Sequence, residues 1–150
     1  MRQVSRPANI DIQSVTQDLV DAVAAVHEAE NQRPADRAYI QQCVSGHPSA
    51  VALSEGRVAG FAYTRTLAPD LLLLSNILVA ADFRGLGIGT RLLQYLEQEA
   101  SRDWSSILLS NSDLWEHPPR RSPIEFYLKH GYQKIWQTPN TQVMAKLLGS

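Results

Sequence analysis

The sequence predicts a mixed α/β protein of the α+β type, with a mostly antiparallel central sheet of about six to seven strands flanked by helices. A hairpin signal, Glu55-Gly56, separates two strand-like segments, and a continuous apolar run at residues 71–79 is typical of a strand buried on both faces. Segments with helical spacing of apolar residues lie on both sides of this region. A chain of 150 residues has the length of one domain, and we expect a single domain at residues 1–150.

Composition and charge narrow the classes of partner. The formal net charge of −1 provides no broad positive field for nucleic acid or anionic lipid. The apolar runs are too short to cross a bilayer, and the N-terminus lacks the apolar segment of a signal peptide. The single cysteine, Cys43, excludes an internal disulfide and a cysteine-rich zinc site. We therefore expect a cytoplasmic protein with no membrane, nucleic-acid or metal partner.

The first third of the chain predicts one strand followed by two helices. Residues 2–6 can form a strand that ends at a proline. Apolar residues at three- and four-residue steps, starting at Ile12, predict a helix to about residue 29. Pro34 is well placed as the first residue of a second helix that ends before Gly46.

The middle of the chain predicts three strands. Residues 50–53 and 58–66 form an antiparallel pair around Glu55-Gly56, where glycine supplies the positive φ of a tight turn. The apolar run at residues 71–79 follows as a strand near the centre of the sheet.

The remaining residues predict alternating helices and strands. A long segment at residues 111–121, rich in proline, charge and aromatic side chains, is typical of a functional surface loop. The predicted elements are a helix at residues 88–100, a strand at 106–110, a short helix that starts at Pro123 and ends at Gly131, and strands at 132–137 and 142–148.

A glycine-rich junction, Arg84-Gly85-Leu86-Gly87-Ile88-Gly89, joins the central strand to the following helix. Unpaired amides at a helix start, with glycines that let a ligand approach the backbone, make an anion site. A P-loop needs lysine and then serine or threonine, but Thr90-Arg91 follows here. A dinucleotide fingerprint needs a further glycine, which neither Thr90 nor Leu92 supplies. A tight connection without a ligand is the plain alternative.

Two motifs resemble signatures of the GNAT superfamily of N-acetyltransferases. In residues 79–89 a valine is followed after four residues by Arg/Gln-x-x-Gly-x-Gly/Ala, and Arg84, Gly87 and Gly89 fill the fixed positions of that acyl-CoA signature. Residues 126–132 are similar to the second signature, Phe-Tyr-x-x-x-Gly-Phe/Tyr. The predicted element order, β-α-α-β-β-β-α-β-α-β-β, is also similar to that of the family, so we expect a GNAT-like sheet.

The resemblance implies that acetyl-CoA is the co-substrate and that no metal takes part. In this family the turn after the fourth strand wraps the CoA pyrophosphate, and the backbone of that strand pairs with the pantetheine arm. The cofactor-binding residues implied in this way are Ile77, Leu78, Val79, Arg84, Gly85, Leu86, Gly87, Ile88, Gly89 and Thr90.

The resemblance also implies acetyl transfer to a primary amine of a small molecule, peptide or protein, by direct attack on the thioester. Tyr127 is implied as the group that meets the departing sulfur. An ordinary tyrosine pKa of about 10 against about 8.5 for a thiol makes full proton transfer uphill by roughly 2 kcal/mol, so a hydrogen bond to the developing thiolate is more economical. No carboxylate lies between Leu71 and Ala81. A non-catalytic acyl-CoA-binding domain and a nucleotide-dependent enzyme are the alternatives.

The amine acceptor is the least defined part of the prediction. Deprotonating an amine with a pKa of about 10.4 at pH 7 costs roughly 4.6 kcal/mol, so the reaction benefits from a general base that accepts the proton directly or through a water. Dimers are frequent in the family, and the sequence leaves monomer and homodimer open. Candidate substrate-binding residues are Glu28, Asn76, Asp113 and His117, and candidate bases are Asp113, Glu116, His117, His27, Glu28 and Glu30, each of which could equally be a plain surface group.

Overall fold

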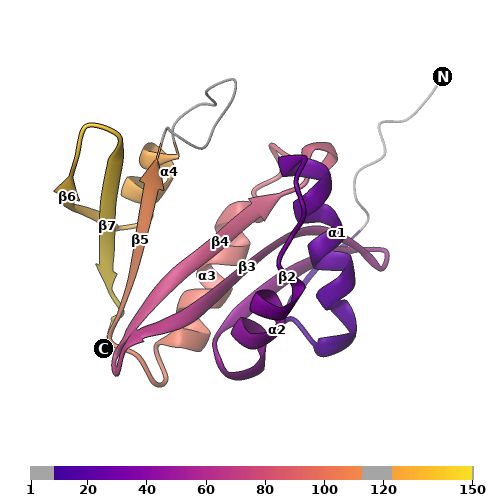
Figure 1. Ribbon diagram of the computed structural model, residues 1–150, viewed down its shortest axis with the longest axis horizontal. Helices are drawn as coiled ribbons and strands as arrows, with labels where there is room; N and C mark the ends of the chain where they lie inside the picture. The colour runs from indigo at the N-terminus through magenta and orange to yellow at the C-terminus, as the bar shows by residue number, and fades with distance from the viewer. Residues whose placement is uncertain (1–8, 113–122, 150) are drawn as a thin grey trace.

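The computed structural model describes residues 9–112 and 123–149 (Figure 1). Within them, seven strands form one sheet in the order β1-β2-β3-β4-β5-β7-β6. Of the strand pairs in these two ranges, only β4–β5 is parallel, so the predicted mostly antiparallel sheet is confirmed. The strands are β1 Ile10–Gln13, β2 Ser49–Ser54, β3 Arg57–Ala68, β4 Leu71–Val79, β5 Ser106–Ser112, β6 Gln133–Gln137 and β7 Thr141–Leu147, and the helices are α1 Val20–Asn31, α2 Arg37–Gly46, α3 Ile88–Ala100 and α4 Ile124–Lys129.

Helices cover both faces of the sheet (Figure 1). On one face, Val23 of α1 and Ile40 of α2 pack against Val51 and Phe61. On the other face, α3 packs against neighbouring positions of the same strands. Its buried residues are the five predicted from helical spacing, Ile88, Leu92, Leu93, Leu96 and Ala100. Because successive side chains of a strand point to opposite faces of the sheet, the core is divided into two layers, one on each face.

The predicted hairpin and central strand are confirmed. Glu55 and Gly56 both have positive φ, 51° and 81°, as a two-residue hairpin turn requires. β4 is the fourth of the seven strands in the sheet order. Leu72 and Leu74 are buried, whereas the other residues of β4 are partly exposed, so the expectation that both faces are fully buried is wrong. An opening beside the second half of β4 accounts for the exposure of residues 75–79.

The predicted start of the first helix is wrong. Ile12 lies in β1, which pairs with β2 and places Ile12 opposite Ala52. A short 3-10 turn at Gln17–Leu19 then leads into α1. Ile10 and Ile12 alternate with exposed residues, which suits a sheet edge, and pairing with β2 outweighs their helical spacing. The strand predicted at residues 2–6 lies outside the described residues.

The second helix also begins later than predicted. It starts at Arg37, because the side chain of Asp36 accepts a hydrogen bond from the Tyr39 backbone N–H at 3.0 Å and caps the helix there. Pro34 therefore lies in the connection between the two helices.

The end of the chain agrees with the predicted order. Pro123 caps α4 instead of forming its first residue, and Gly131 follows the helix with a positive φ of 92°. Most of the loop expected at residues 111–121 lies outside the described residues. No helix in the described ranges is long and apolar enough to cross a membrane.

Candidate functional site

The sheet opens between β4 and β5. These two strands pair only between residues 71–73 and 106–108. Beyond that point β4 continues against β3, and β5 continues against β7, so the two strands diverge (Figure 1). Among the described residues, the second half of β4 therefore has one edge without a strand partner, where backbone N–H and C=O groups can pair with a ligand.

A cavity of about 450 Å³ occupies this opening, which is within the range of small-molecule sites. Residues 74–79 of β4 form one wall and residues 109–111 of β5 form another. Gly89 at the start of α3 lies at the cavity, as do Tyr127 of α4 and Asn31 at the end of α1. The cavity thus connects the glycine junction with the second sequence motif.

A bulge in β4 alters which side chains face the helices. Tyr63 pairs with Asn76 and Thr64 pairs with Leu74, so Ser75 has no partner on β3. Leu74 and Ile77 both pack in the core layer beside α3. In a regular strand, residues on one face are an even number of positions apart, whereas Leu74 and Ile77 are separated by an odd number. The two residues between them, Ser75 and Asn76, can therefore both lie on the other face.

Two tyrosines meet this polar pair. The Ser75 Oγ lies 2.7 Å from the Tyr39 Oη, and the Asn76 Nδ2 donates to the Tyr63 Oη at 3.4 Å. Burial raises the pKa of both tyrosine hydroxyls, so both remain neutral hydrogen-bonding groups at physiological pH. Sequence reasoning missed Ser75, Tyr39 and Tyr63. The break in the leucine alternation at Ser75-Asn76 is the signal that could have revealed the bulge.

The turn after β4 has the geometry of an anion site. Gly85 and Gly87 adopt positive φ, 81° and 78°, which other residues rarely do. The Arg91 N–H donates to the Gly87 carbonyl at 3.2 Å, as the first helical bond into α3. The amides just before Arg91 have no partner within the helix and lie at the positive end of its dipole.

The side chain of Arg84 crosses from this turn to the end of α1. Its Nη2 lies 2.6 Å from the Glu30 Oε1, and its Nε donates to the Val79 carbonyl at 3.1 Å. The Glu30 Oε2 also accepts from the Ala81 N–H at 3.1 Å. Glu30, which the sequence offered as a candidate base, thus contacts Ala81 and Arg84, which lie near the two ends of the segment between β4 and the glycines.

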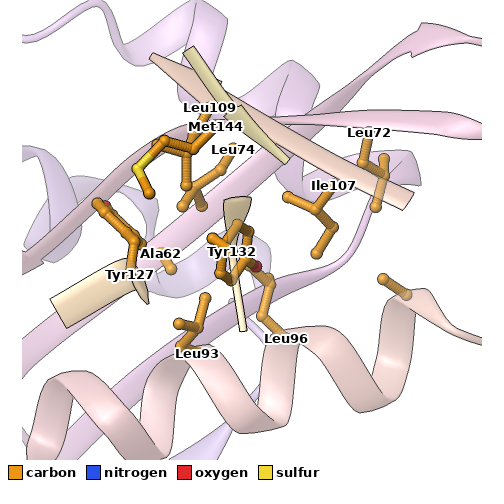
Figure 2. Packing of buried hydrophobic residues seen from close by; sticks show 11 residues of the cluster. Ala62, Leu72, Leu74, Leu93, Leu96, Ile107, Leu109, Tyr127, Tyr132 and Met144 are labelled. Carbon is orange, nitrogen blue, oxygen red and sulfur yellow. The ribbon is translucent and has the colours of Figure 1, made fainter. Parts of the chain in front are cut away.

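Tyr127 is 5% exposed and lies at the cavity wall. Figure 2 shows it in a cluster of buried side chains from β3, β4, β5, β7 and α3. Its ring packs edge-on against that of Tyr132, with centroids 5.7 Å apart. Burial raises the pKa of Tyr127 to about 12, so its hydroxyl can donate a hydrogen bond but holds its proton firmly.

The other predicted cofactor residues occupy different positions around the turn. Ile77, Leu78, Val79 and Gly89 line the cavity. The side chain of Ile88 is buried in the core, so only its backbone can face a ligand. Leu86 is exposed, and the Thr90 Oγ1 lies 3.1 Å from the His130 Nε2.

The predicted acceptor residues are only partly brought together. Asn76 lines the cavity, whereas Glu28 is not among its described lining residues. The Glu28 Oε2 accepts from the Ala35 N–H at 3.0 Å and from Arg37 at 3.1 Å, and these two bonds lower its pKa. Desolvation lowers the pKa of the candidate base His27. Asp113, Glu116 and His117 lie outside the described residues.

The arrangement can hold an extended ligand with a phosphorylated end. Phosphate oxygens can accept from the amides before Arg91, and an amide-bearing chain can pair with the open edge of β4. The far end of such a ligand then lies near Tyr127 and the bulge at Ser75.

Comparisons with known proteins agree with this geometry. A family model described as the acetyltransferase (GNAT) domain matches residues 45–134. No curated protein sequence matches the chain significantly.

Several solved structures have the same fold. The ribosomal-protein-S18-alanine N-acetyltransferase of Escherichia coli is 20% identical with a TM-score of 0.75, over 95% of this chain and 96% of that one. The aminoglycoside 6′-N-acetyltransferase of Enterococcus faecium is 21% identical with a TM-score of 0.78, over 93% and 98%. A phosphinothricin acetyltransferase of Sinorhizobium meliloti in complex with acetyl-CoA is 19% identical with a TM-score of 0.75, over 93% and 89%.

Proposed function

Since the chain belongs to the GNAT acetyltransferase family, we propose that it transfers the acetyl group of acetyl-CoA to a primary amine by direct attack on the thioester. The observation that carries the proposal is the single cavity that reaches from Gly89, at the glycine turn, to Tyr127. Both residues belong to the two motifs by which the chain resembles the family. Because one cavity reaches both residues, a single extended ligand can contact both motifs.

The proposed pose of acetyl-CoA follows the polarity of the site. Its pyrophosphate lies at the amides of residues 85–90, which the helix dipole makes favourable for negative charge. Its pantetheine amides pair with the backbone of residues 77–79, on the open edge of β4. The thioester then lies beside Tyr127 and the bulge. Acetyl-CoA in a similar structure, the phosphinothricin acetyltransferase, supports this co-substrate.

In the proposed reaction, the amine nitrogen attacks the carbonyl carbon of the thioester and the C–S bond breaks. The sulfur leaves with the bonding electron pair, and the nitrogen loses a proton. With the pKa of Tyr127 at about 12 and that of a thiol at about 8.5, transfer of the tyrosine proton to sulfur is uphill by about 5 kcal/mol. Tyr127 therefore acts as a hydrogen-bond donor to the developing thiolate.

The proton of the amine leaves to solvent, directly or through a water held by a polar side chain of the cavity. Among the described residues that line the cavity, none is a carboxylate, and the polar ones are Asn31, Ser75, Asn76, Ser110, Asn111 and Tyr127. At pH 7 an α-amine with a pKa of about 8 is deprotonated at a cost of about 1.4 kcal/mol, against about 4.6 kcal/mol for a lysine-type amine. We therefore expect kcat/KM at pH 7 to rise as the pKa of the amine falls.

A panel of primary amines tests the proposal, with the release of free CoA thiol as readout. The panel contains peptide α-amines, lysine-type amines and aminoglycosides, and each reaction has a blank without amine. Thermal shifts with acetyl-CoA, ATP and NAD run in parallel. We expect stabilisation by acetyl-CoA alone and amine-dependent thiol release. Binding of acetyl-CoA with no release across the panel would favour the non-catalytic alternative.

The remaining expectations belong to the same proposal. The enzyme works without a metal and without nucleic acid, in the cytoplasm, as a monomer or a homodimer. The amine acceptor enters from the side of α1 and α2, where Asn31 and Asn76 line the cavity.

A further inference from the structure

The end of α1 is tied to the glycine junction by one carboxylate. Glu30 lies 54 residues before Arg84, and the two side chains form an ion pair of 2.6 Å. The Glu30 side chain is only 16% exposed, so solvent screens it less than an ordinary surface carboxylate. A charge-assisted bond between residues so far apart in sequence ties the end of α1 to the turn after β4.

Two further hydrogen bonds of this pair fall on the connection between β4 and α3. Glu30 accepts from the Ala81 N–H, and Arg84 donates to the Val79 carbonyl at the end of the strand. Residues 79, 81 and 84 are thereby held at three points, immediately before the positive-φ glycines. The guanidinium donates to the Glu30 carboxylate and to the Val79 carbonyl, so Arg84 links the end of α1 to the backbone at the end of β4.

We propose that Glu30 is a positioning residue that holds the pyrophosphate-binding turn in its binding conformation through Arg84 and the Ala81 amide. The inference rests on the proposed function, because it assumes that the turn binds the pyrophosphate of CoA. Amides that already point at the phosphate position lose little conformational freedom when the ligand binds. Asn31, the next residue, lines the cavity, so the contact made by Glu30 lies next to the site.

Glu28 provides a matched control on the same helix. Like Glu30, it accepts from one arginine and from one backbone N–H, here Arg37 and Ala35. Neither partner belongs to the glycine junction. Each of Glu28→Ala and Glu30→Ala therefore removes one bond to an arginine and one to a backbone N–H, and only the second releases the turn.

The test measures ligand binding, which needs no acceptor. Isothermal titration calorimetry gives Kd for CoA, and ligand-observed NMR gives Kd for pantetheine, which lacks the pyrophosphate. We expect Glu30→Ala to raise Kd for CoA about tenfold, with no change for pantetheine. Glu30→Gln, which keeps an oxygen that can accept from Ala81, restores part of the affinity. Glu28→Ala leaves Kd for CoA unchanged.

Four results would overturn the proposal. They are an unchanged or tighter CoA affinity in Glu30→Ala, an equal loss for pantetheine, an equal loss in Glu28→Ala, and fully additive effects of Glu30→Ala and Arg84→Gln. If the two residues act through one contact, the double variant should lose no more CoA affinity than the larger of the two single losses. Additive losses would therefore contradict the proposal. Melting temperatures of all variants identify any that fail to fold, and the Glu30→Gln titration remains decisive in that case. If the wild-type protein does not bind CoA at all, the proposed function itself has failed.

Discussion

The substitution Tyr127→Phe isolates the hydroxyl group that we place beside the departing sulfur. The ring is buried in the cluster shown in Figure 2, and phenylalanine keeps its volume and its contacts with Tyr132. The hydroxyl makes no hydrogen bond to another described residue. We therefore expect the variant to fold with nearly unchanged stability.

The expected loss of activity follows from the charge on the leaving group. A hydrogen bond to a charged partner contributes about 1.5–3 kcal/mol, so its loss in the transition state lowers kcat by about 10- to 150-fold. The neutral thioester sulfur is a weak acceptor, so Kd for acetyl-CoA remains nearly unchanged. Because the pKa of Tyr127 is about 12, the wild-type rate also shows no titration of this group below pH 10.

The assay compares kcat from thiol release with Kd for acetyl-CoA from calorimetry. Tyr132→Phe is the control, since it also removes a buried tyrosine hydroxyl. That hydroxyl donates to the Glu97 Oε2 at 2.8 Å, away from the described cavity lining. We expect Tyr132→Phe to lower the melting temperature and to leave kcat unchanged. An unchanged kcat in Tyr127→Phe, or an equal loss in the control, would refute the role of Tyr127.

Three further predictions concern the turn, the sheet and alkaline pH. Gly87→Ala places a side chain at a φ of 78°, which lowers the free energy of unfolding by about 1–2 kcal/mol and weakens CoA binding. In Gly89→Ala the added Cβ lies 3.5 Å from Phe126, an ordinary contact, so stability and CoA binding are preserved. Equal effects of the two substitutions in denaturation and calorimetry would contradict this prediction. Gly60→Ala lowers stability by about 1–3 kcal/mol, because its Cβ lies 2.9 Å from the Leu78 carbonyl; an unchanged urea midpoint would contradict this. The unfolded tyrosine ionises near pH 10 and the folded Tyr127 near pH 12. The contribution of Tyr127 to stability is therefore unchanged below pH 10 and falls by about 3 kcal/mol between those values, a loss that Tyr127→Phe should reduce in alkaline melts.

Local sequence patterns were sufficient for the elements that depend on neighbouring residues. The turn at Glu55-Gly56 requires positive φ, and the stripe of α3 follows from helical spacing. The glycine junction was recognisable for the same reason, since its conformation depends on the residues themselves. β1 was missed because four residues carry little pattern, and only their pairing with β2 makes them a strand.

The rest of the candidate site depends on contacts between distant residues. The bulge at Ser75 is defined by the register with β3, and Tyr39 reaches Ser75 from 36 residues away. Glu30 appeared in the sequence as a possible base, yet its carboxylate lies against Arg84 and Ala81. No spacing rule predicts such partners, because the folded sheet brings them together.

The central claim is that one molecule of acetyl-CoA acetylates one amine in the cavity between β4 and β5. Its most direct measurement quantifies free CoA and acetylated amine in the same reaction, by thiol titration and mass spectrometry. We predict equal amounts of the two products, both dependent on the amine and both strongly reduced in Tyr127→Phe. Thiol release without an acetylated amine, or bound acetyl-CoA that no amine of the panel consumes, would contradict the account.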